Sequence, residues 1–266
     1  MKTAIRLLVA LALPAILFFS ACKDDNGVNL FTVEDDKAFG LQMKEMIQSD
    51  PAKYPVLNKN QHPEAYSHIE RVRDSILATG LVNYDKEFVW EVFIINDTIM
   101  NAFCTPGGYV YFFTDLIKFL DNEAEFAGVM AHEMSHAARR HSTQQLTKAY
   151  GLQILLSIVL GQNPNQLAEI AADLAAGVAF LAFSRSDEYQ ADEDAVKYLY
   201  ATSYDARGVA GFFEKIEGNP QPPEFLSTHP NPGNRIEKIL EIWQSLGGKE
   251  GETFPDRYQQ FKNSLP

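Results

Sequence analysis

Apolar side chains recur every three or four residues along several stretches of the chain, which is the spacing of one face of an α-helix. The clearest stretch covers residues 63–79, with apolar positions at Tyr66, Ile69, Val72 and Ile76. The same spacing predicts further helices over residues 39–46, 121–137, 167–183, 184–200 and 233–246. The chain is therefore expected to be mainly helical.

A different pattern, rich in β-branched and aromatic residues, occupies residues 88–113 and predicts strands. Runs at 88–95 and 109–113 flank a shorter run at 100–104, and polar or glycine-rich residues supply the turns between them. These runs predict a small antiparallel sheet, and together with the helices they predict an α+β fold. Residues 37–266 are expected to form a single domain.

The first 21 residues have the pattern of a secretory signal. Two basic residues precede an apolar run over residues 7–19, which is shorter than the ~20 residues that a membrane-spanning helix needs. Ser20-Ala21-Cys22 resembles a bacterial lipobox, which implies a lipid anchor on Cys22 in the cell envelope; an ordinary cleaved signal with an incidental cysteine is the alternative. Residues 22–36 are then predicted to be a tether.

The composition of the chain is compatible with a folded domain and argues against nucleic acid as a binding partner. The chain has 266 residues, of which 46% are hydrophobic, and this is enough for a sizeable core. The formal charge is −12, and removing the two basic residues of the signal lowers it to −14. Binding to nucleic acid is not expected, because no run of basic residues offers a surface to phosphates. Cys104 is expected to be a small buried side chain.

The candidate chemistry lies in His132-Glu133-Met134-Ser135-His136, within the predicted helix over residues 121–137. Residues four apart in a helix share a face, so His132 and His136 can bind one metal ion. Glu133 then lies beside the ion, where a carboxylate takes a proton from water whose pKa the ion has lowered to roughly 7. This H-E-x-x-H arrangement predicts one Zn²⁺ per chain; two surface histidines on an ordinary helix are the alternative.

A catalytic zinc that keeps one position for water needs a third protein ligand. The chain has Arg139 and Ser142 where a metzincin needs glycine and histidine, and His141 is expected to project off the metal face of the same helix. Glu188 is the better candidate. Asp192 lies one turn further along the predicted helix over residues 184–200, where it can accept the spare N–H of a ligating histidine.

Taken together, these segments resemble the CAAX prenyl protease and HtpX-like family of zinc metallopeptidases, which are gluzincins, in its soluble lipoprotein branch. The resemblance spans about residues 36–243 and includes neither the transmembrane segments nor the C-terminal helical repeats of other branches. Four blocks carry it: Asn101-Ala102-Phe103 with Pro106-Gly107-Gly108; His132 to His136; Arg185 with Glu188 and Ala191-Asp192; and Ser227-Thr228-His229-Pro230 with Arg235. It implies that His132, His136 and Glu188 bind zinc and that Glu133 activates the water.

The resemblance also implies roles outside the zinc ligands. His229 would either hydrogen-bond the oxyanion of the reaction or take the fourth zinc position in a resting state; a solvated turn histidine is the alternative. Arg185 and Arg235 would neutralise buried carboxylates, orient His229, or be purely structural.

A polypeptide substrate is implied as well. In gluzincins an extended substrate adds beside an edge strand, which would be Asn101-Ala102-Phe103 here. The apolar region over residues 151–183 is either a core helix or a flap over the cleft. The expected function is a zinc endopeptidase that acts on misfolded envelope proteins. The alternatives are a non-proteolytic, chaperone-like lipoprotein with a structural zinc, and a structural lipoprotein whose motif is accidental.

Overall fold

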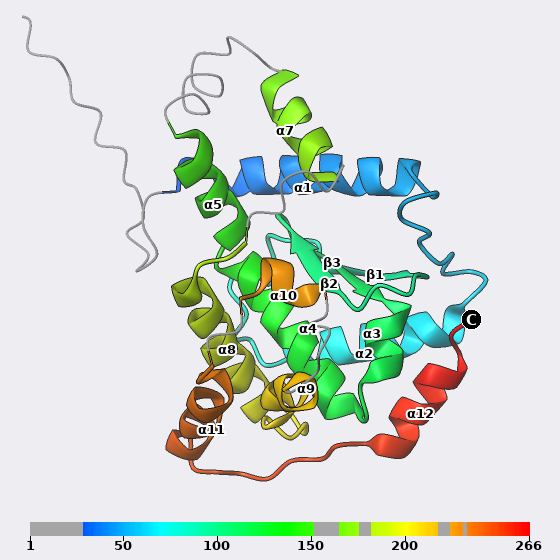
Figure 1. Cartoon of the computed structure of the whole chain (residues 1–266), viewed down its shortest axis with the longest axis vertical. Helices are drawn as coiled ribbons and strands as arrows, with labels where there is room; N and C mark the ends of the chain where they lie inside the picture. Colours follow the sequence, from blue (N-terminus) through cyan, green and yellow to red (C-terminus); the bar gives the residue numbers. More distant parts are fainter. Residues whose placement is uncertain (1–28, 152–164, 176–181, 218–223, 231–232) are drawn as a thin grey trace, which may run out of the picture.

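The structure is a computed structural model and describes residues 29–151, 165–175, 182–217, 224–230 and 233–266 (Figure 1). The predicted signal over residues 1–21, Cys22 and the first part of the predicted tether lie outside the described residues. So do parts of the region over residues 151–183. Among the helices that the structure describes, none has both the length and the apolar character needed to cross a membrane.

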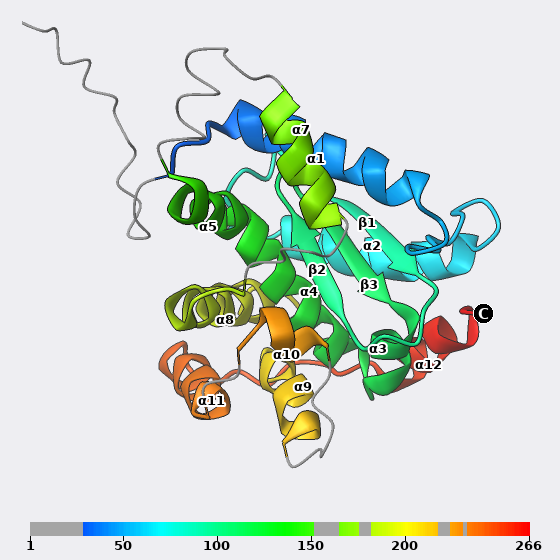
Figure 2. The same cartoon turned by 45° about the horizontal axis from the view of Figure 1, so that its top comes forward.

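A three-stranded sheet lies at the centre of the molecule (Figure 2). It contains β1 (Glu91–Ile95), β2 (Ala102–Thr105) and β3 (Tyr109–Phe113), in the order β1-β3-β2. The expected antiparallel arrangement is correct for the β2–β3 hairpin but wrong for β1, which pairs with β3 in parallel. The reason is the connection over residues 96–101, which is long enough to pass the end of β3 instead of making a tight turn. As a result β2 is an edge strand.

One helix, α4 (Glu123–Ala138), lies against one face of the sheet and is buried along its whole length. The helices α2 (Pro63–Leu77), α8 (Arg185–Tyr200) and α9 (Gly208–Ile216) pack around it (Figure 2). Small residues permit this packing: a Cβ atom on Gly128 would lie 2.7 Å from the backbone oxygen of Gly208. The predicted mainly helical α+β architecture is confirmed, with the H-E-x-x-H helix at its centre.

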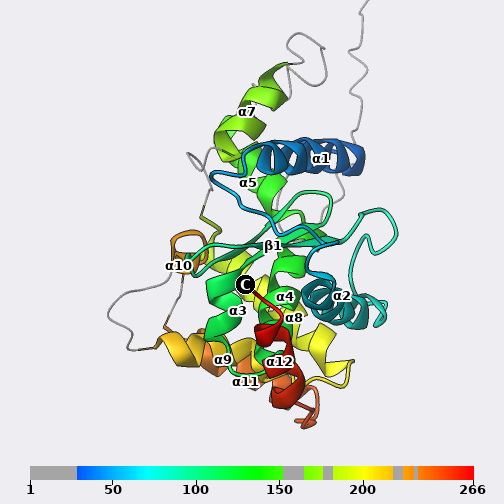
Figure 3. The same cartoon turned by 90° about the vertical axis from the view of Figure 1, so that its right-hand side faces the viewer.

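The other face of the sheet is covered by α1 (Val33–Ser49), and α5 (His141–Tyr150) and α7 (Asn165–Ala175) lie on the same side (Figures 1 and 3). The predicted tether is wrong from Asn29 onward. The Asn29 amide donates to the Thr143 hydroxyl, Phe31 is buried, and Thr32 caps α1 through a capping box with Asp35. The scattered apolar residues of this segment therefore belong to the domain.

The remaining helices are α3 (Thr114–Phe119), α10 (Phe225–Thr228), α11 (Arg235–Ser245) and α12 (Pro255–Asn263). The last predicted helix ended at residue 246, so α12 is a helix that the sequence pattern did not predict. Tyr258 and Phe261 of α12 are buried in the main core, and the Tyr258 hydroxyl donates to the backbone oxygen of Ile117. Figure 3 shows α12 beside α2 and α4. The end of the chain thus supports the N-terminal half of α4.

Candidate metal centre

Two helices with well-defined starts present the candidate ligands. In α4, the side chain of Asn122 accepts a hydrogen bond from the Glu125 backbone N–H at the N-terminus. Ser184 caps α8 through a capping box with Asp187, and this places Glu188 in the first turn of that helix. These caps satisfy N–H groups that would otherwise lack partners, so each helix starts at a fixed residue. The long contact between α4 and α8 then brings their side chains together.

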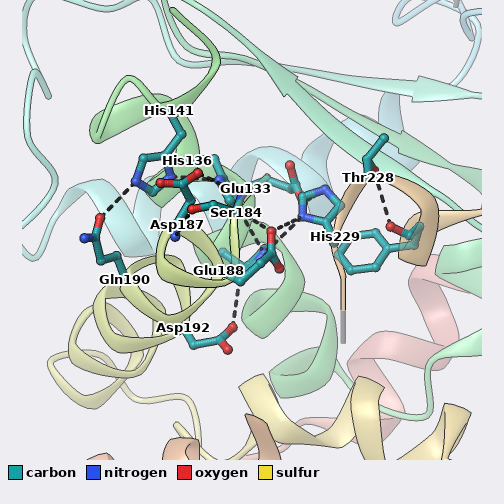
Figure 4. A network of polar contacts seen from close by, with 12 residues as sticks. Glu133, His136, His141, Ser184, Asp187, Glu188, Gln190, Asp192, Thr228 and His229 are labelled. Atoms are coloured by element: carbon teal, nitrogen blue, oxygen red, sulfur yellow. Dashed lines mark hydrogen bonds and ion pairs between the residues drawn. The ribbon is translucent and has the colours of Figure 1, made fainter. Parts of the chain in front are cut away.

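Four buried side chains converge at this contact (Figure 4). Donor atoms of His132, His136, Glu188 and His229 all lie within 4.8 Å of one another. The Nε2 atoms of His132 and His136 are 3.0 Å apart, and Glu188 Oε1 lies 3.4 Å from His136 Nε2. His229 follows α10, and its Nδ1 atom lies 3.4 Å from His132 Nε2 and 3.1 Å from Glu188 Oε1.

The spacing of these atoms fits a zinc ion. Ligand atoms held tetrahedrally at about 2.0–2.1 Å from zinc are about 3.3 Å from one another, and the separations above are close to this value. Nitrogen and carboxylate oxygen donors are also a preferred set for zinc. The cluster could therefore hold the metal with His132, His136, Glu188 and His229 as ligands.

Glu133 lies beside the cluster and is fully buried. Neither of its carboxylate oxygens has a hydrogen-bond partner among the described residues, although His229 Nε2 lies 3.4 Å from Oε1. Burial raises the pKa of Glu133, against the opposing effect of the neighbouring imidazoles. Because a buried carboxylate without partners is costly, the site is suited to a ligand that brings both positive charge and a hydrogen-bond donor.

Burial and neighbouring charged groups together shift the pKa values of Glu188, His136 and His229. Burial alone would raise the pKa of Glu188, but contacts with His229 and His136 lower it well below its usual range. Burial also lowers the pKa of His136. For His229, burial opposes the charged form, but the carboxylates of Glu133 and Glu188 outweigh it and raise the pKa.

Behind His132, Asp192 and Arg235 form a buried pair. Asp192 Oδ1 lies 3.0 Å from His132 Nδ1, as the sequence predicted for a partner of the ligating histidine. Arg235 donates two hydrogen bonds to Asp192, of 2.7 and 2.6 Å, and its third nitrogen lies 2.7 Å from Glu188 Oε2. Arg235 is thus in contact with both carboxylates that α8 directs into the site.

Arg185 does not join them, which corrects the prediction. It occupies the first helical position of α8 and is exposed, and no ion pair to another described residue involves it. Glu188, in the same turn, is buried against α4, whereas the Arg185 side chain is exposed to solvent. Of the two candidate arginines, only Arg235 lies at the site.

His141 was expected to project away from the metal face, and this prediction is wrong. Arg140 has a left-handed conformation with φ of 61°, so α4 ends there and His141 begins α5. Its fully buried ring returns toward the site, with Nδ1 2.9 Å from His136 Nδ1 and Nε2 3.1 Å from Gln190 Oε1 (Figure 4). Burial lowers the pKa of His141 to about 4. The predicted helix ended at residue 137, but no glycine marks the left-handed residue, and the sequence pattern did not show that His141 lies beside His136.

Phe183 is a further neighbour that the sequence did not single out. Its ring stacks on His136 with 3.9 Å between centroids, and its backbone N–H donates to the Thr228 oxygen. This hydrogen bond connects the segment before α8 to the segment that carries His229.

A small cavity of about 40 Å³ opens beside the cluster, with room for a few water molecules. Phe103 and Cys104 of the edge strand line it, while Asn101 precedes β2 and Ala102 is buried in the core. The other apolar lining comes from α1, α5 and α7, mainly Phe39, Met43, Leu146 and Leu174. Residues of the region over 151–183 thus cover part of the cavity.

The profile of peptidase family M48 matches residues 63–243. The chain belongs to peptidase family M48. This range includes the sheet, α4, α8 and all four members of the histidine and glutamate cluster.

Individual relatives agree with the family. The mitochondrial metalloendopeptidase OMA1 of Arabidopsis thaliana is 35% identical over 153 residues, which are 57% of this chain and 31% of the relative. The beta-barrel assembly-enhancing protease of Escherichia coli K12 is 32% identical over 157 residues, 54% of this chain and 32% of the relative. The chain therefore covers about a third of these relatives. A putative protease of the same name from Vibrio cholerae matches over 77% of this chain at 27% identity.

Proposed function

We propose that the protein is a zinc-dependent endopeptidase with Glu133 as general base. The observation that carries the proposal is a fully buried carboxylate that has no hydrogen-bond partner among the described residues and lies beside four converging ligand atoms. When bound, the zinc ion acidifies water and polarises a carbonyl group. Glu133 takes a proton from the attacking water as the oxygen bonds to the peptide carbon, and then gives that proton to the leaving nitrogen as the C–N bond breaks.

His229 makes the structure a resting form under this proposal. Catalytic zinc sites keep a position open, whereas sites with four protein ligands are closed. His229 Nδ1 lies among the other donor atoms and would fill that fourth position. The segment around His229 must therefore move before water can enter, after which the imidazole is free to donate a hydrogen bond to the oxyanion.

We further propose polypeptide substrates that bind along β2. An edge strand can pair with an extended chain, and the cavity beside β2 has an apolar lining that suits an apolar side chain. The names of the bacterial relatives support a role with envelope proteins. Quality control of misfolded envelope proteins, lipid anchoring through Cys22 and membership of the CAAX protease and HtpX-like branch are parts of this proposal.

The closed ligand set also favours a second candidate. Four protein ligands are typical of structural zinc, so the chain could instead be a chaperone-like lipoprotein that holds unfolded polypeptides. This function requires the ligands but does not require Glu133.

Zinc content and casein hydrolysis of the protein without its first 22 residues, measured with and without Glu133→Gln, separate the two candidates. The peptidase predicts one zinc per chain in both proteins and hydrolysis only by the wild type. Zinc in both proteins with hydrolysis in neither would favour the structural zinc. Absence of zinc from the wild type would refute both candidates.

A further inference from the structure

We propose that His141 is a positioning residue: its neutral imidazole accepts the Nδ1–H of His136, and Gln190 holds His141 in the tautomer that makes this possible. The inference rests on the proposed metal centre, because it concerns the orientation of one of its ligands. It does not depend on whether the protein cleaves peptides.

The backbone supports this arrangement. The left-handed residue Arg140 ends α4 directly after the turn that carries His136, and α5 begins with His141. The two rings meet nearly edge to face, with an interplanar angle of 70° and centroids 4.9 Å apart. Both rings are fully buried, so water does not compete for the contact between the two Nδ1 atoms.

The hydrogen positions follow from the contacts. His136 directs Nε2 at the other ligands, so this nitrogen must be free of a proton to bind a metal, and the proton of a neutral ring is then on Nδ1. Two nitrogens 2.9 Å apart need one donor and one acceptor, so Nδ1 of His141 is the acceptor. The proton of His141 is then on Nε2, where it is donated to Gln190 Oε1 at 3.1 Å. Each ring nitrogen of His136 and His141 thus has one consistent role as donor, acceptor or metal ligand.

The neutral acceptor also suits the charge of the site. His132 already contacts a carboxylate, Asp192, and the carboxylates that touch the cluster are those of Glu133, Glu188 and Asp192. Asp187 is also buried, but it is hydrogen-bonded to Gln145 and to the Ser184 backbone N–H. A divalent ion and the Arg235 guanidinium would balance the three negative charges at the cluster. A second carboxylate behind His136 would leave an unpaired buried charge, which is strongly unfavourable.

Zinc affinity tests the proposal, measured by competition with a chromogenic chelator. His141→Phe keeps a ring but has no acceptor, and we expect zinc binding to weaken about 10–100-fold, the usual effect of losing such a partner. His141→Asn places an amide oxygen near the Nδ1 position and should restore most of the affinity. Gln190→Met, which removes the acceptor for His141, should give a smaller loss in the same direction.

A spectroscopic measurement separates orientation from packing. In ¹H–¹⁵N spectra of the zinc-bound protein, the Nδ1–H proton of His136 should be shifted downfield in the wild type and in His141→Asn, and should move upfield in His141→Phe. If His141→Phe does not fold, His141→Gln serves instead, because its oxygen reaches past the Nδ1 position and should not restore affinity as His141→Asn does.

Wild-type affinity in His141→Phe, or equal losses in His141→Phe and His141→Asn, would overturn the proposal while leaving the zinc site intact. A wild-type protein that binds no zinc would overturn the proposed function as well.

Discussion

Removing the charge of Arg235 should destabilise the metal-free protein more than a typical core substitution does. Arg235 is 1% exposed and contacts both Asp192 and Glu188 at 2.6–2.7 Å. Arg235→Met keeps the apolar stem of the side chain and removes the guanidinium, so the main loss is electrostatic. Breaking a buried ion pair from one side costs about 3–5 kcal/mol. For a domain of this size, that lowers the melting temperature by about 6–20 °C.

The pH dependence of the stability difference between wild type and Arg235→Met tests whether the loss is electrostatic. Burial opposes ionisation of Asp192, but Arg235 outweighs it and lowers the pKa of this carboxyl group. A carboxyl group with a lowered folded-state pKa adds stability above its unfolded-state pKa, and this stability is lost as the pH falls through the folded-state value. The difference between wild type and Arg235→Met should therefore be largest near pH 7 and shrink below about pH 4.

The assay is thermal unfolding with chelator present, followed by circular dichroism at pH 7 and at pH values from 4 down to 3. Arg185→Met is the matched control, because Arg185 is exposed at the start of α8 and its loss should change the melting temperature little. A difference below about 1 kcal/mol at pH 7, or one that does not depend on pH, would refute the view that Arg235 balances these two carboxylates.

Three further predictions concern the centre and its supporting helix. Gly128→Ala should destabilise the fold by about 1–3 kcal/mol in denaturant titrations, because the added Cβ would lie 2.7 Å from the Gly208 backbone oxygen; a neutral effect would show that α4 and α9 can separate easily. His229→Ala should weaken zinc binding and lower casein hydrolysis by about 10²–10³, because the variant loses the proposed oxyanion donor; a rise in hydrolysis would show instead that His229 acts only by filling the fourth position. Excess chelator should abolish hydrolysis while the far-ultraviolet circular dichroism stays unchanged, and unfolding on chelation would contradict the preassembled site described below.

Local sequence patterns predicted the parts of the site that lie on regular helices. The spacing of His132 and His136 follows from helical periodicity. Glu188 was identified because a catalytic zinc needs a third protein ligand, and Asp192 because it lies one turn further along the same predicted helix. His229 lies in a loop after a four-residue helix, where periodicity gives no information. Only the resemblance to a family singled it out.

The errors have physical reasons as well. Arg185 and Arg235 were equivalent as sequence positions, but only tertiary packing decides which arginine is buried, and α11 brings Arg235 to α8. His141 was misplaced because helical periodicity was extended through Arg140, a non-glycine residue in the left-handed region. The antiparallel pairing expected of β1 was wrong because strand pairing depends on contacts that are distant in sequence.

The structure explains how the site can be in place before a metal binds. In small zinc domains the metal supplies the folding energy, because little else orders the ligands. Here Arg139 of the α4 C-terminus donates to Asp194 of α8 at 2.5 and 2.7 Å, and Ser135 donates to the same carboxylate. Arg235 of α11 contacts Glu188 itself and Asp192, one turn later. These contacts fix α8 against α4 and α11, so the ligands are expected to stay ordered without the ion, and the metal is needed for chemistry more than for the fold.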